Sequence, residues 1–407
     1  MKELTLKMTD FAYGGAVIGR DKRRRPVFVQ GAIPGETIQA AVFKDKGRYA
    51  HANLVNVIHA AQERVQAPCP HFDLCNGCHY QHMTYETQLR AKREVVLDQL
   101  LRIGKLKKPK VLPVLPNPTP WSYAIQMSFS PSEDGRLGLW SAKMRQVMHI
   151  ETCAILHPRL LELFQDIDMQ LDGLRKLTLR IDSSENMMAA LEVDDVEPPE
   201  LEVDFPVSVA IVLPDRTAAS LIGDPYLVQE IKGHSFRVSP GCFFQPNWAG
   251  AELLIDAVLA YAGLEGNELV VEAYSGVGTL TAFLAAEAQE LIAIEVNDDA
   301  VADFVANLNH LDNTKLYHGM VEEALAVLDT RPDLLVANPG KGGLTAPVIQ
   351  SIKALGPPRL VYVSSELSTL ARDAKNLSRA GYRLLEVQPI DIRPQTFYVD
   401  TVSFWKK

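Results

Sequence analysis

The sequence predicts an α/β protein in which a C-terminal doubly wound, Rossmann-like domain follows an N-terminal β-barrel and a central α+β domain. Apolar strand-like runs alternate with helical segments from about residue 241, and short β-rich runs separated by glycine turns fill residues 1–60. The chain of 407 residues is also too long for one ordinary core. We therefore expect three domains, at residues 1–60, 61–240 and 241–407.

Residues 1–60 are predicted to form a small five-stranded barrel, because turn signals at Gly14, Gly31 and Gly35 separate the β-rich runs. Barrels of this kind bind single-stranded nucleic acid through a basic groove and stacked aromatic side chains. Four aromatic residues either stack on bases or fill the barrel core: Phe11, Tyr13, Phe43 and Tyr49.

The charge is divided unevenly along a chain whose net charge is −9. Residues 1–110 hold 19 of the 41 Lys and Arg residues but only 10 of the 50 Asp and Glu residues. The basic clusters at 20–25 and 105–110 indicate either phosphate binding or a pair of solvated turns. Residues 192–204 are strongly acidic, and we expect them to form a solvated loop that points away from a nucleic acid.

The composition is typical of a soluble globular protein, with 47% hydrophobic and 22% charged residues. No run of apolar residues is long enough to predict a membrane span, and the N-terminus lacks the apolar stretch of a signal peptide. We therefore expect a cytoplasmic protein, whose five cysteines are metal ligands or free thiols rather than disulfides.

Four of the cysteines have the spacing of a metal site. Cys69, Cys75 and Cys78 are close in sequence, and Cys153 is a distant fourth thiol. Four thiolates bind either zinc or an iron–sulfur cluster, and the spacing alone does not choose between them. Cys242 is left over and is expected to be a small buried hydrophobic residue.

Residues 241–407 show the alternation expected of a parallel sheet covered by helices. The strand-like runs are 269–274, 291–295, 334–337 and 360–363, and the helical segments are 280–288, 298–309, 346–355 and 367–380. In the central domain, an amphipathic pattern predicts a helix from about residue 84 to residue 104.

A glycine-containing turn at 272–279 joins the first of these strands to the next helix, where the backbone can approach a ligand closely. Glu295 ends the following strand, about 20 residues on, where an acid accepts hydrogen bonds from ribose hydroxyls. A third glycine and a phosphate-binding lysine are both missing from the turn. This pattern indicates a cofactor without pyrophosphate, and S-adenosylmethionine fits it.

Two segments resemble known families. The run GGAVIGR…PVFVQGAIPGE…KGRYAHANLVNVI resembles a TRAM domain, an OB-like RNA-binding module. The segment CPHFDLCNGCHYQHMTYETQLRAKREVVLDQLLRIG, together with the later CAIL, resembles the iron–sulfur segment of bacterial ribosomal-RNA uracil-C5 methyltransferases. The second resemblance implies a 4Fe–4S cluster held by Cys69, Cys75, Cys78 and Cys153.

Further motifs resemble the same methyltransferase family. The segment YSGVGT is similar to the family's YCGVGT, and CFFQPN is similar to its FFQxN. The resemblance implies S-adenosylmethionine as the cofactor and an rRNA or tRNA as the partner. It implies these cofactor-binding residues: Gln245, Tyr274, Gly276, Glu295 and Asn338.

The catalytic loops of the family are recognisable but altered. Family members add a cysteine thiolate to C6 of uracil, so that C5 attacks the methyl group, and a carboxylate base then removes the C5 proton. Ser365 stands at the position of the thiolate, and Asp400 stands at the position of the glutamate base. Residues 338–344, which correspond to the loop DPPRxGL, begin with Asn338 instead of Asp.

Ser365 leaves three interpretations open. A serine hydroxyl needs an adjacent base to become a nucleophile, so addition to uracil is disfavoured. Alternatively, the enzyme methylates another RNA atom without a covalent intermediate, or the chain is an inactive RNA-binding paralogue. A small-molecule methyltransferase is a weaker alternative because it leaves the barrel without a role. We expect an RNA methyltransferase with altered or lost uracil-C5 chemistry, acting as a monomer.

Overall fold

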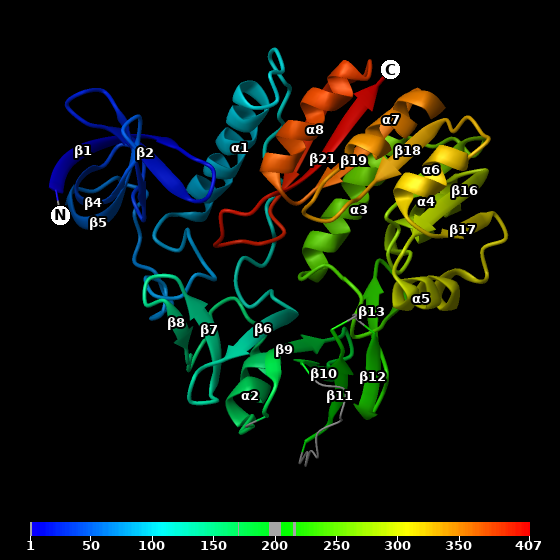
Figure 1. The fold of residues 1–407 in the computed structure, drawn as a ribbon, viewed down its shortest axis with the longest axis horizontal. Helices are drawn as coiled ribbons and strands as arrows, with labels where there is room; N and C mark the ends of the chain where they lie inside the picture. The colour runs from blue at the N-terminus through cyan, green and yellow to red at the C-terminus, as the bar shows by residue number, and fades with distance from the viewer. Residues whose placement is uncertain (1, 170, 195–204, 215–216) are drawn as a thin grey trace.

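The computed structural model describes residues 2–169, 171–194, 205–214 and 217–407. Figure 1 shows a barrel at the upper left, a central sheet below it, and a larger sheet with helices on both faces at the right. This architecture confirms the predicted fold class. In the described part of the chain, no helix has both the length and the apolar character needed to cross a bilayer.

The N-terminal barrel is closed by five strands in the order β1-β2-β3-β5-β4, which confirms the prediction. The strands are β1 (Lys2–Phe11), β2 (Ala16–Arg20), β3 (Pro26–Gln30), β4 (Thr37–Asp45) and β5 (Ala50–His59). Alternate residues such as Leu6, Val17 and Val29 point inward and are buried, as the two-residue period of a strand requires. Phe11 belongs to this core, whereas Phe43 and Tyr49 are exposed.

Two helices and a seven-stranded sheet form the central region. Helix α1 (Tyr85–Arg102) is predicted correctly, and it contacts β1 of the barrel and α8 of the C-terminal part. The sheet order is β12-β11-β10-β9-β6-β7-β8, and α2 (Pro158–Asp166) packs on β9. The strands are β6 (Gln126–Pro131), β7 (Leu137–Ser141), β8 (Gln146–Met148), β9 (Leu174–Ile181), β10 (Met187–Val193), β11 (Val207–Val212) and β12 (Ala218–Ile222). A hairpin of β13 (Leu227–Ile231) and β14 (His234–Val238) leads into the C-terminal part.

The C-terminal sheet has the order β17-β16-β15-β18-β19-β21-β20. Its strands are β15 (Leu269–Ala273), β16 (Glu290–Glu295), β17 (Thr314–His318), β18 (Leu334–Ala337), β19 (Arg359–Ser364), β20 (Arg383–Ile390) and β21 (Asp400–Lys406). Its helices are α3 (Trp248–Ala262), α4 (Thr279–Glu287), α5 (Asp298–Leu308), α6 (Val321–Val327), α7 (Ala346–Leu355) and α8 (Leu367–Arg379). β15 to β19 are parallel, and the hairpin β20–β21 adds two antiparallel strands.

Two hydrophobic cores lie on the two faces of the C-terminal sheet and join it to the other regions. One contains Leu177 of the central sheet together with Leu254 and Val336. The other contains Val29 of the barrel together with Val96 of α1 and Leu370 of α8. Because each core crosses a region boundary, burial of apolar surface holds the three regions in fixed contact.

Three details differ from the expectations or lie beyond them. The strand expected at 269–274 ends at Ala273, because Tyr274 adopts a left-handed backbone that cannot continue a strand. The C-terminal hairpin β20–β21 is not among the predicted elements. The acidic stretch begins inside β10, where Glu192 pairs with Lys176, and its residues 195–204 lie outside the described part of the chain.

Candidate functional site

A cavity of about 940 Å³ lies between the carboxyl ends of the C-terminal parallel strands and the central sheet. Ligands bind doubly wound sheets at this edge, at the point where the strand order reverses, which here is between β15 and β18. All seven residues predicted for the cofactor and the reaction line this cavity: Gln245, Tyr274, Gly276, Glu295, Asn338, Ser365 and Asp400. The fold therefore brings them to one site, while the role of each residue stays a prediction.

The loop between β15 and α4 has an unusual backbone. Tyr274, Gly276 and Gly278 have positive φ angles of 65°, 58° and 87°. A Cβ atom on Gly278 would lie 2.5 Å from Cδ1 of Leu308, so α5 leaves room there only for glycine. A Cβ atom on Gly276 would meet no atom within 4 Å, and this residue lines the cavity. The loop thus offers open backbone to a ligand beside the N-terminus of α4.

Glu295, the last residue of β16, is fixed beside this loop. Its Oε2 atom accepts a hydrogen bond from the N–H of Gly276 at 2.9 Å. Its Oε1 atom accepts from the N–H groups of Val296 and Asn297, both at 2.8 Å. Three backbone donors therefore hold the carboxylate, and a lone pair of Oε2 stays free to accept from a hydroxyl in the cavity.

Gln245 lies in the connection between β14 and α3, just before a helix cap. Asn247 accepts a hydrogen bond from the N–H of Gly250 at 3.1 Å and donates to the carbonyl of Ile392 at 3.1 Å. These bonds fix the start of α3 against the segment that follows β20. Cys242, in the same connection, is 2% exposed and belongs to the core, as predicted.

The loop at 338–344 is anchored from α8. Asp373 is fully buried and accepts a hydrogen bond from the N–H of Leu344 at 2.8 Å. Arg372 donates to the carbonyl of Gly342 at 2.7 Å and pairs with Asp373 at 2.8 Å. Asn338, at the start of the loop, is thereby held in the cavity wall next to the end of β18.

Ser365 lies between β19 and α8, and no base contacts its hydroxyl. The described residues provide no hydrogen-bond partner for this hydroxyl, and no histidine is found among the described residues that line the cavity. The neighbouring Glu366 accepts a hydrogen bond from the hydroxyl of Tyr13, which belongs to the barrel. Ser365 therefore lacks the partner that would convert an alcohol into a nucleophile.

Asp400, the first residue of β21, is buried and ion-paired. Nη2 of Arg393 donates to its Oδ2 at 3.0 Å, and the same guanidinium lies 4.9 Å from the centre of the Tyr398 ring. The Asp400 carboxylate is thus engaged by Arg393 in this arrangement.

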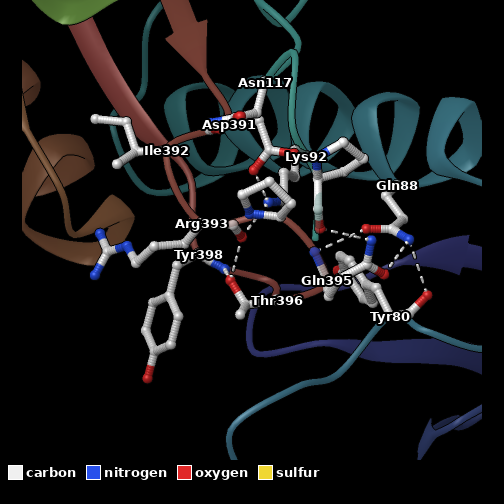
Figure 2. A network of polar contacts seen from close by, with 12 residues as sticks. Tyr80, Gln88, Lys92, Asn117, Asp391, Ile392, Arg393, Gln395, Thr396 and Tyr398 are labelled. Atoms are coloured by element: carbon white, nitrogen blue, oxygen red, sulfur yellow. Dashed lines mark hydrogen bonds and ion pairs between the residues drawn. The ribbon is translucent and has the colours of Figure 1, made fainter. Parts of the chain in front are cut away.

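A buried polar network fixes the segment that carries Arg393 (Figure 2). Lys92 of α1 is fully buried, pairs with Asp391 and donates to the carbonyl of Arg393 at 3.0 Å. Gln88, one turn earlier on α1, exchanges two hydrogen bonds with Gln395, at 2.9 and 3.1 Å. Figure 2 shows that the side chains of Arg393 and Tyr398 extend away from this network. Helix α1 therefore positions one wall of the cavity without entering it.

The four cysteines of the predicted metal site surround a second, smaller cavity. Cys69, Cys75, Cys78 and Cys153 all line a space of about 30 Å³ next to β7. Burial raises the pKa of the Cys78 thiol to about 12 and also raises the pKa values of Cys75 and Cys153. In the described parts of the chain, no group of three or more His, Cys, Asp or Glu side chains has the arrangement of a metal site. Metal binding here stays a prediction.

The cavity wall also contains residues that the sequence did not single out. Arg180 of β9 and Arg393 are two of them, and Phe243 is a third, with 68% of its surface exposed at the cavity. The alternation of Lys176, Thr178 and Arg180 with buried leucines in β9 is a sequence signal that could have identified one polar wall. Arg393 could not be found in this way, because its position depends on contacts with α1.

Comparison with known proteins identifies relatives over the whole chain. Residues 2–55 match the TRAM domain family. An RNA methyltransferase of Chlorobaculum tepidum is 30% identical, with 99% of this chain and 96% of that protein covered. An RNA methyltransferase of Halalkalibacterium halodurans is also 30% identical, with 93% of this chain and 91% of that protein covered.

The fold is similar to that of a solved structure along almost the entire chain. The Pyrococcus abyssi tRNA (uracil-54, C5)-methyltransferase, in complex with S-adenosyl-L-homocysteine, has a TM-score of 0.74 and 22% identity. The match covers 98% of this chain and 99% of that one. The arrangement of barrel, central region and doubly wound domain is therefore shared as a unit.

Proposed function

This chain belongs to the uracil-5 type of RNA methyltransferases with an N-terminal TRAM domain, and we propose that it transfers the methyl group of S-adenosylmethionine to a nucleotide of RNA. One observation carries this proposal. A single cavity joins the glycine loop and Glu295 to the loops of Asn338, Ser365 and Asp400. The first two elements would hold the cofactor, the loops of Ser365 and Asp400 would face the acceptor, and Asn338 would contact both.

The cofactor-binding role follows from the donors and acceptors around the glycine loop. Glu295 would accept a hydrogen bond from a ribose hydroxyl, and the open backbone at Gly276 would lie against the cofactor. Gln245, Tyr274 and Asn338 would complete the contacts from three sides of the cavity. When bound, S-adenosylmethionine supplies an activated methyl group.

The acceptor atom is proposed to be one that needs no covalent activation. Ser365 has no base in contact with its hydroxyl, and Asp400 is paired with Arg393, so neither residue supports addition to uracil C6 followed by removal of the C5 proton. Asn338 and the following Pro339 offer hydrogen-bond acceptors to an amino group, whose methylation needs no covalent intermediate. The residues thus support methylation of another RNA atom better than methylation at C5.

A second candidate is an RNA-binding protein without turnover. The pairing of Asp400 with Arg393 and the contact of Glu366 with Tyr13 engage both carboxylates near Ser365 in structural contacts. A site that no longer catalyses a reaction would tolerate contacts that occupy its carboxylates. Under this second hypothesis, the chain has the same fold and binds RNA but does not transfer a methyl group.

Methyl transfer is tested with radiolabelled S-adenosylmethionine and RNA from a strain that lacks this protein. We expect calorimetry to detect cofactor binding and Glu295→Ala to weaken it by about 10-fold or more. We expect Ser365→Ala to retain methyl transfer within about threefold of the unchanged protein, because the hydroxyl is not used as a nucleophile. A loss of about 100-fold, with a covalent adduct on 5-fluorouracil RNA, would instead establish Ser365 as the nucleophile. Cofactor binding without transfer to any RNA would favour the second candidate.

The cysteine cavity is proposed to hold a 4Fe–4S cluster. A cluster binds each thiolate at a separate iron atom, so its ligands lie farther apart than those of one metal ion. Four cysteines around one small cavity support this proposal, and binding of a positively charged cluster would deprotonate thiols whose pKa values burial raises. We expect a brown protein with about four iron and four sulfide per chain after anaerobic purification. Equimolar zinc without sulfide would contradict the cluster.

A further inference from the structure

One face of the central sheet forms a polar wall of the cavity that the glycine loop also lines. In β9, Leu177 and Leu179 are fully buried in the core, whereas Lys176, Thr178 and Arg180 alternate with them and line the cavity. Ser128 of the neighbouring strand β6 lies directly opposite Thr178, within 2.9 Å between the two hydroxyl oxygens. The wall is therefore built from rigid strands and not from loops.

Arg180 differs from the other cations of this wall because it has no counter-ion among the residues that the structure describes. Lys176 pairs with Glu192, and Arg175 pairs with Asp194. Among the described residues, the Arg180 side chain makes one hydrogen bond, from Nη1 to the carbonyl of Ser239 at 3.3 Å, and no ion pair. Its Nε atom is buried and has no partner.

Among the described residues, the surroundings of Arg180 supply no negative charge that is free to pair with it, because the nearby Glu192 is already paired with Lys176. Its cross-strand neighbours are Gln126 and Met188, which are neutral. Cys242 is near, but burial raises the pKa of its thiol so far that the group is uncharged at neutral pH. A hollow of about 10 Å³ beside Arg180 has room for about one water, which can accept a hydrogen bond but cannot neutralise the charge.

A half-buried guanidinium without a counter-ion is costly in the free protein. Desolvation lowers the pKa of Arg180, yet arginine does not lose its proton in proteins, so the charge persists. Such a group is stabilised when an anion with two oxygens enters the cavity and accepts bidentate hydrogen bonds. The unpaired side chain therefore points to an anionic ligand.

We propose that Arg180, supported by the polar wall of β6 and β9, binds a backbone phosphate of RNA next to the nucleotide that enters the cavity. This inference rests on the proposed function and describes how the acceptor RNA would be held at that site. Arg180 comes from the central sheet, whereas Gly276 and Glu295 come from the C-terminal sheet and its first loop, and all three line the same cavity. A phosphate at Arg180 would place the adjoining nucleotide between the wall and the cofactor loops.

The carboxylate of the cofactor is the other anion that could reach this guanidinium, and the test separates the two. The binding of a fluorescein-labelled 20-nucleotide single-stranded RNA is measured by anisotropy over a range of salt concentrations, and cofactor binding is measured by calorimetry. The variants are Arg180→Met, Arg180→Lys and, as a charge-matched control outside the cavity, Arg159→Met. Arg159 lies on α2 and pairs with Glu162.

We expect Arg180→Met to lower RNA affinity by about 10-fold or more and to reduce the slope of log K against log salt by about 0.7, the loss of one phosphate contact on a single strand. Arg180→Lys should restore the slope but only part of the affinity, because a lysine lacks the bidentate fork. Arg180→Met should also raise the melting temperature, since it removes an unpaired buried charge, whereas a structural role would lower it.

Unchanged RNA affinity and slope in Arg180→Met would overturn the inference. So would a fall in cofactor affinity with RNA binding intact, which would assign Arg180 to the cofactor carboxylate. If the unchanged protein binds the cofactor but no RNA, the proposed function itself fails, and the inference fails with it. Arg159→Met is expected to leave RNA affinity and slope unchanged.

Discussion

Glu272 shows at the scale of one residue how burial sets a protonation state in the cavity. It is 1% exposed on β15 and accepts a hydrogen bond from the hydroxyl of Thr281 at 2.6 Å. Desolvation, with a smaller contribution from the charge of Glu295, raises the pKa of Glu272 to about 8. At neutral pH the folded protein therefore keeps this carboxyl protonated, whereas the unfolded chain ionises it.

The pH dependence of stability follows from this difference. Between about pH 4.5 and 8 the folded state binds one more proton at Glu272 than the unfolded state, so the free energy of unfolding falls as the pH rises through this window. Glu272→Gln keeps an uncharged side chain of the same shape. We expect the variant to match the unchanged protein near pH 4.5 and to exceed it by about 3–5 kcal/mol above pH 8.

Thermal unfolding of both proteins across pH 4.5–9 measures this difference. Subtracting the free energy of unfolding of the unchanged protein from that of Glu272→Gln at each pH removes the contributions of the other titrating groups, which both proteins share. Parallel stability curves would show that Glu272 ionises normally in the folded state. The control is Glu290→Gln, because Glu290 makes a surface ion pair with Lys315 and should change stability by no more than about 1 kcal/mol at any pH.

Residues whose position depends on local backbone geometry could be predicted from the sequence. Gly276, Gly278 and Glu295 follow strands at a fixed spacing, and the structure places them where that spacing predicts. Arg180 and Arg393 could not be predicted as site residues. An arginine in a sequence gives no sign of whether its side chain is buried or which group it contacts, and both are known only from the structure. The position of the glycine loop was therefore predictable from the sequence, whereas the buried arginines of the cavity wall were not.

At the scale of elements, helix α1 is more than an amphipathic connection. Its apolar spacing predicted the helix correctly, but no sequence pattern distinguished Lys92 on the same helix. In the structure Lys92 and Asp391 are both fully buried, with 0% of each side chain exposed. The pair ties α1 to the segment between β20 and β21, which carries Arg393.

Breaking this pair should destabilise the protein strongly. Lys92→Met leaves the buried carboxylate of Asp391 without a counter-charge, and we expect a loss of about 3–5 kcal/mol in the free energy of unfolding. The double variant Lys92→Met with Asp391→Leu should recover most of the loss, since neither charge is then left alone. Urea unfolding, followed by circular dichroism, measures both.

A surface pair in the same region serves as the control. Lys110 pairs with Glu386 of β20 but has 64% of its side chain exposed. Lys110→Met should change the free energy of unfolding by no more than about 1 kcal/mol. If Lys92→Met and Lys110→Met lower the free energy of unfolding equally, the ion pair of Lys92 with Asp391 does not hold α1 to the C-terminal segment.

At the scale of the whole molecule, the order of domains could be predicted, but their common cores could not. Periodicity and turn residues define each region separately, and the predicted barrel and doubly wound sheet are both observed. The contacts that join Val29, Val96 and Leu370 in one core come from parts of the chain far apart in sequence, which no local pattern reports. The contact of Tyr13 with Glu366 likewise links the barrel to the loop of Ser365.

The barrel also presents an aromatic surface to solvent. Phe28, Phe43 and Tyr49 gather around His51, with ring centres 5.5 to 6.1 Å from the histidine ring. Phe43 is 57% exposed and Tyr49 is 39% exposed. Exposed lysines and an arginine follow Phe43 along the chain, at Lys44, Lys46 and Arg48. Exposed rings beside cations form the kind of platform on which unpaired bases stack.

Replacing these rings should weaken the binding of RNA to the barrel, outside the cavity. Stacking of one base on an aromatic side chain contributes about 1–3 kcal/mol, so we expect Phe43→Ala and Tyr49→Ala each to lower affinity for single-stranded RNA by about 5- to 100-fold. Because both rings are exposed, the melting temperature should hardly change. The control is Val55→Ala, which removes a non-aromatic side chain that is 52% exposed on β5 of the same barrel. If all three variants bind RNA equally well, the aromatic surface does not stack on bases, and RNA would have to reach the cavity without the barrel's help.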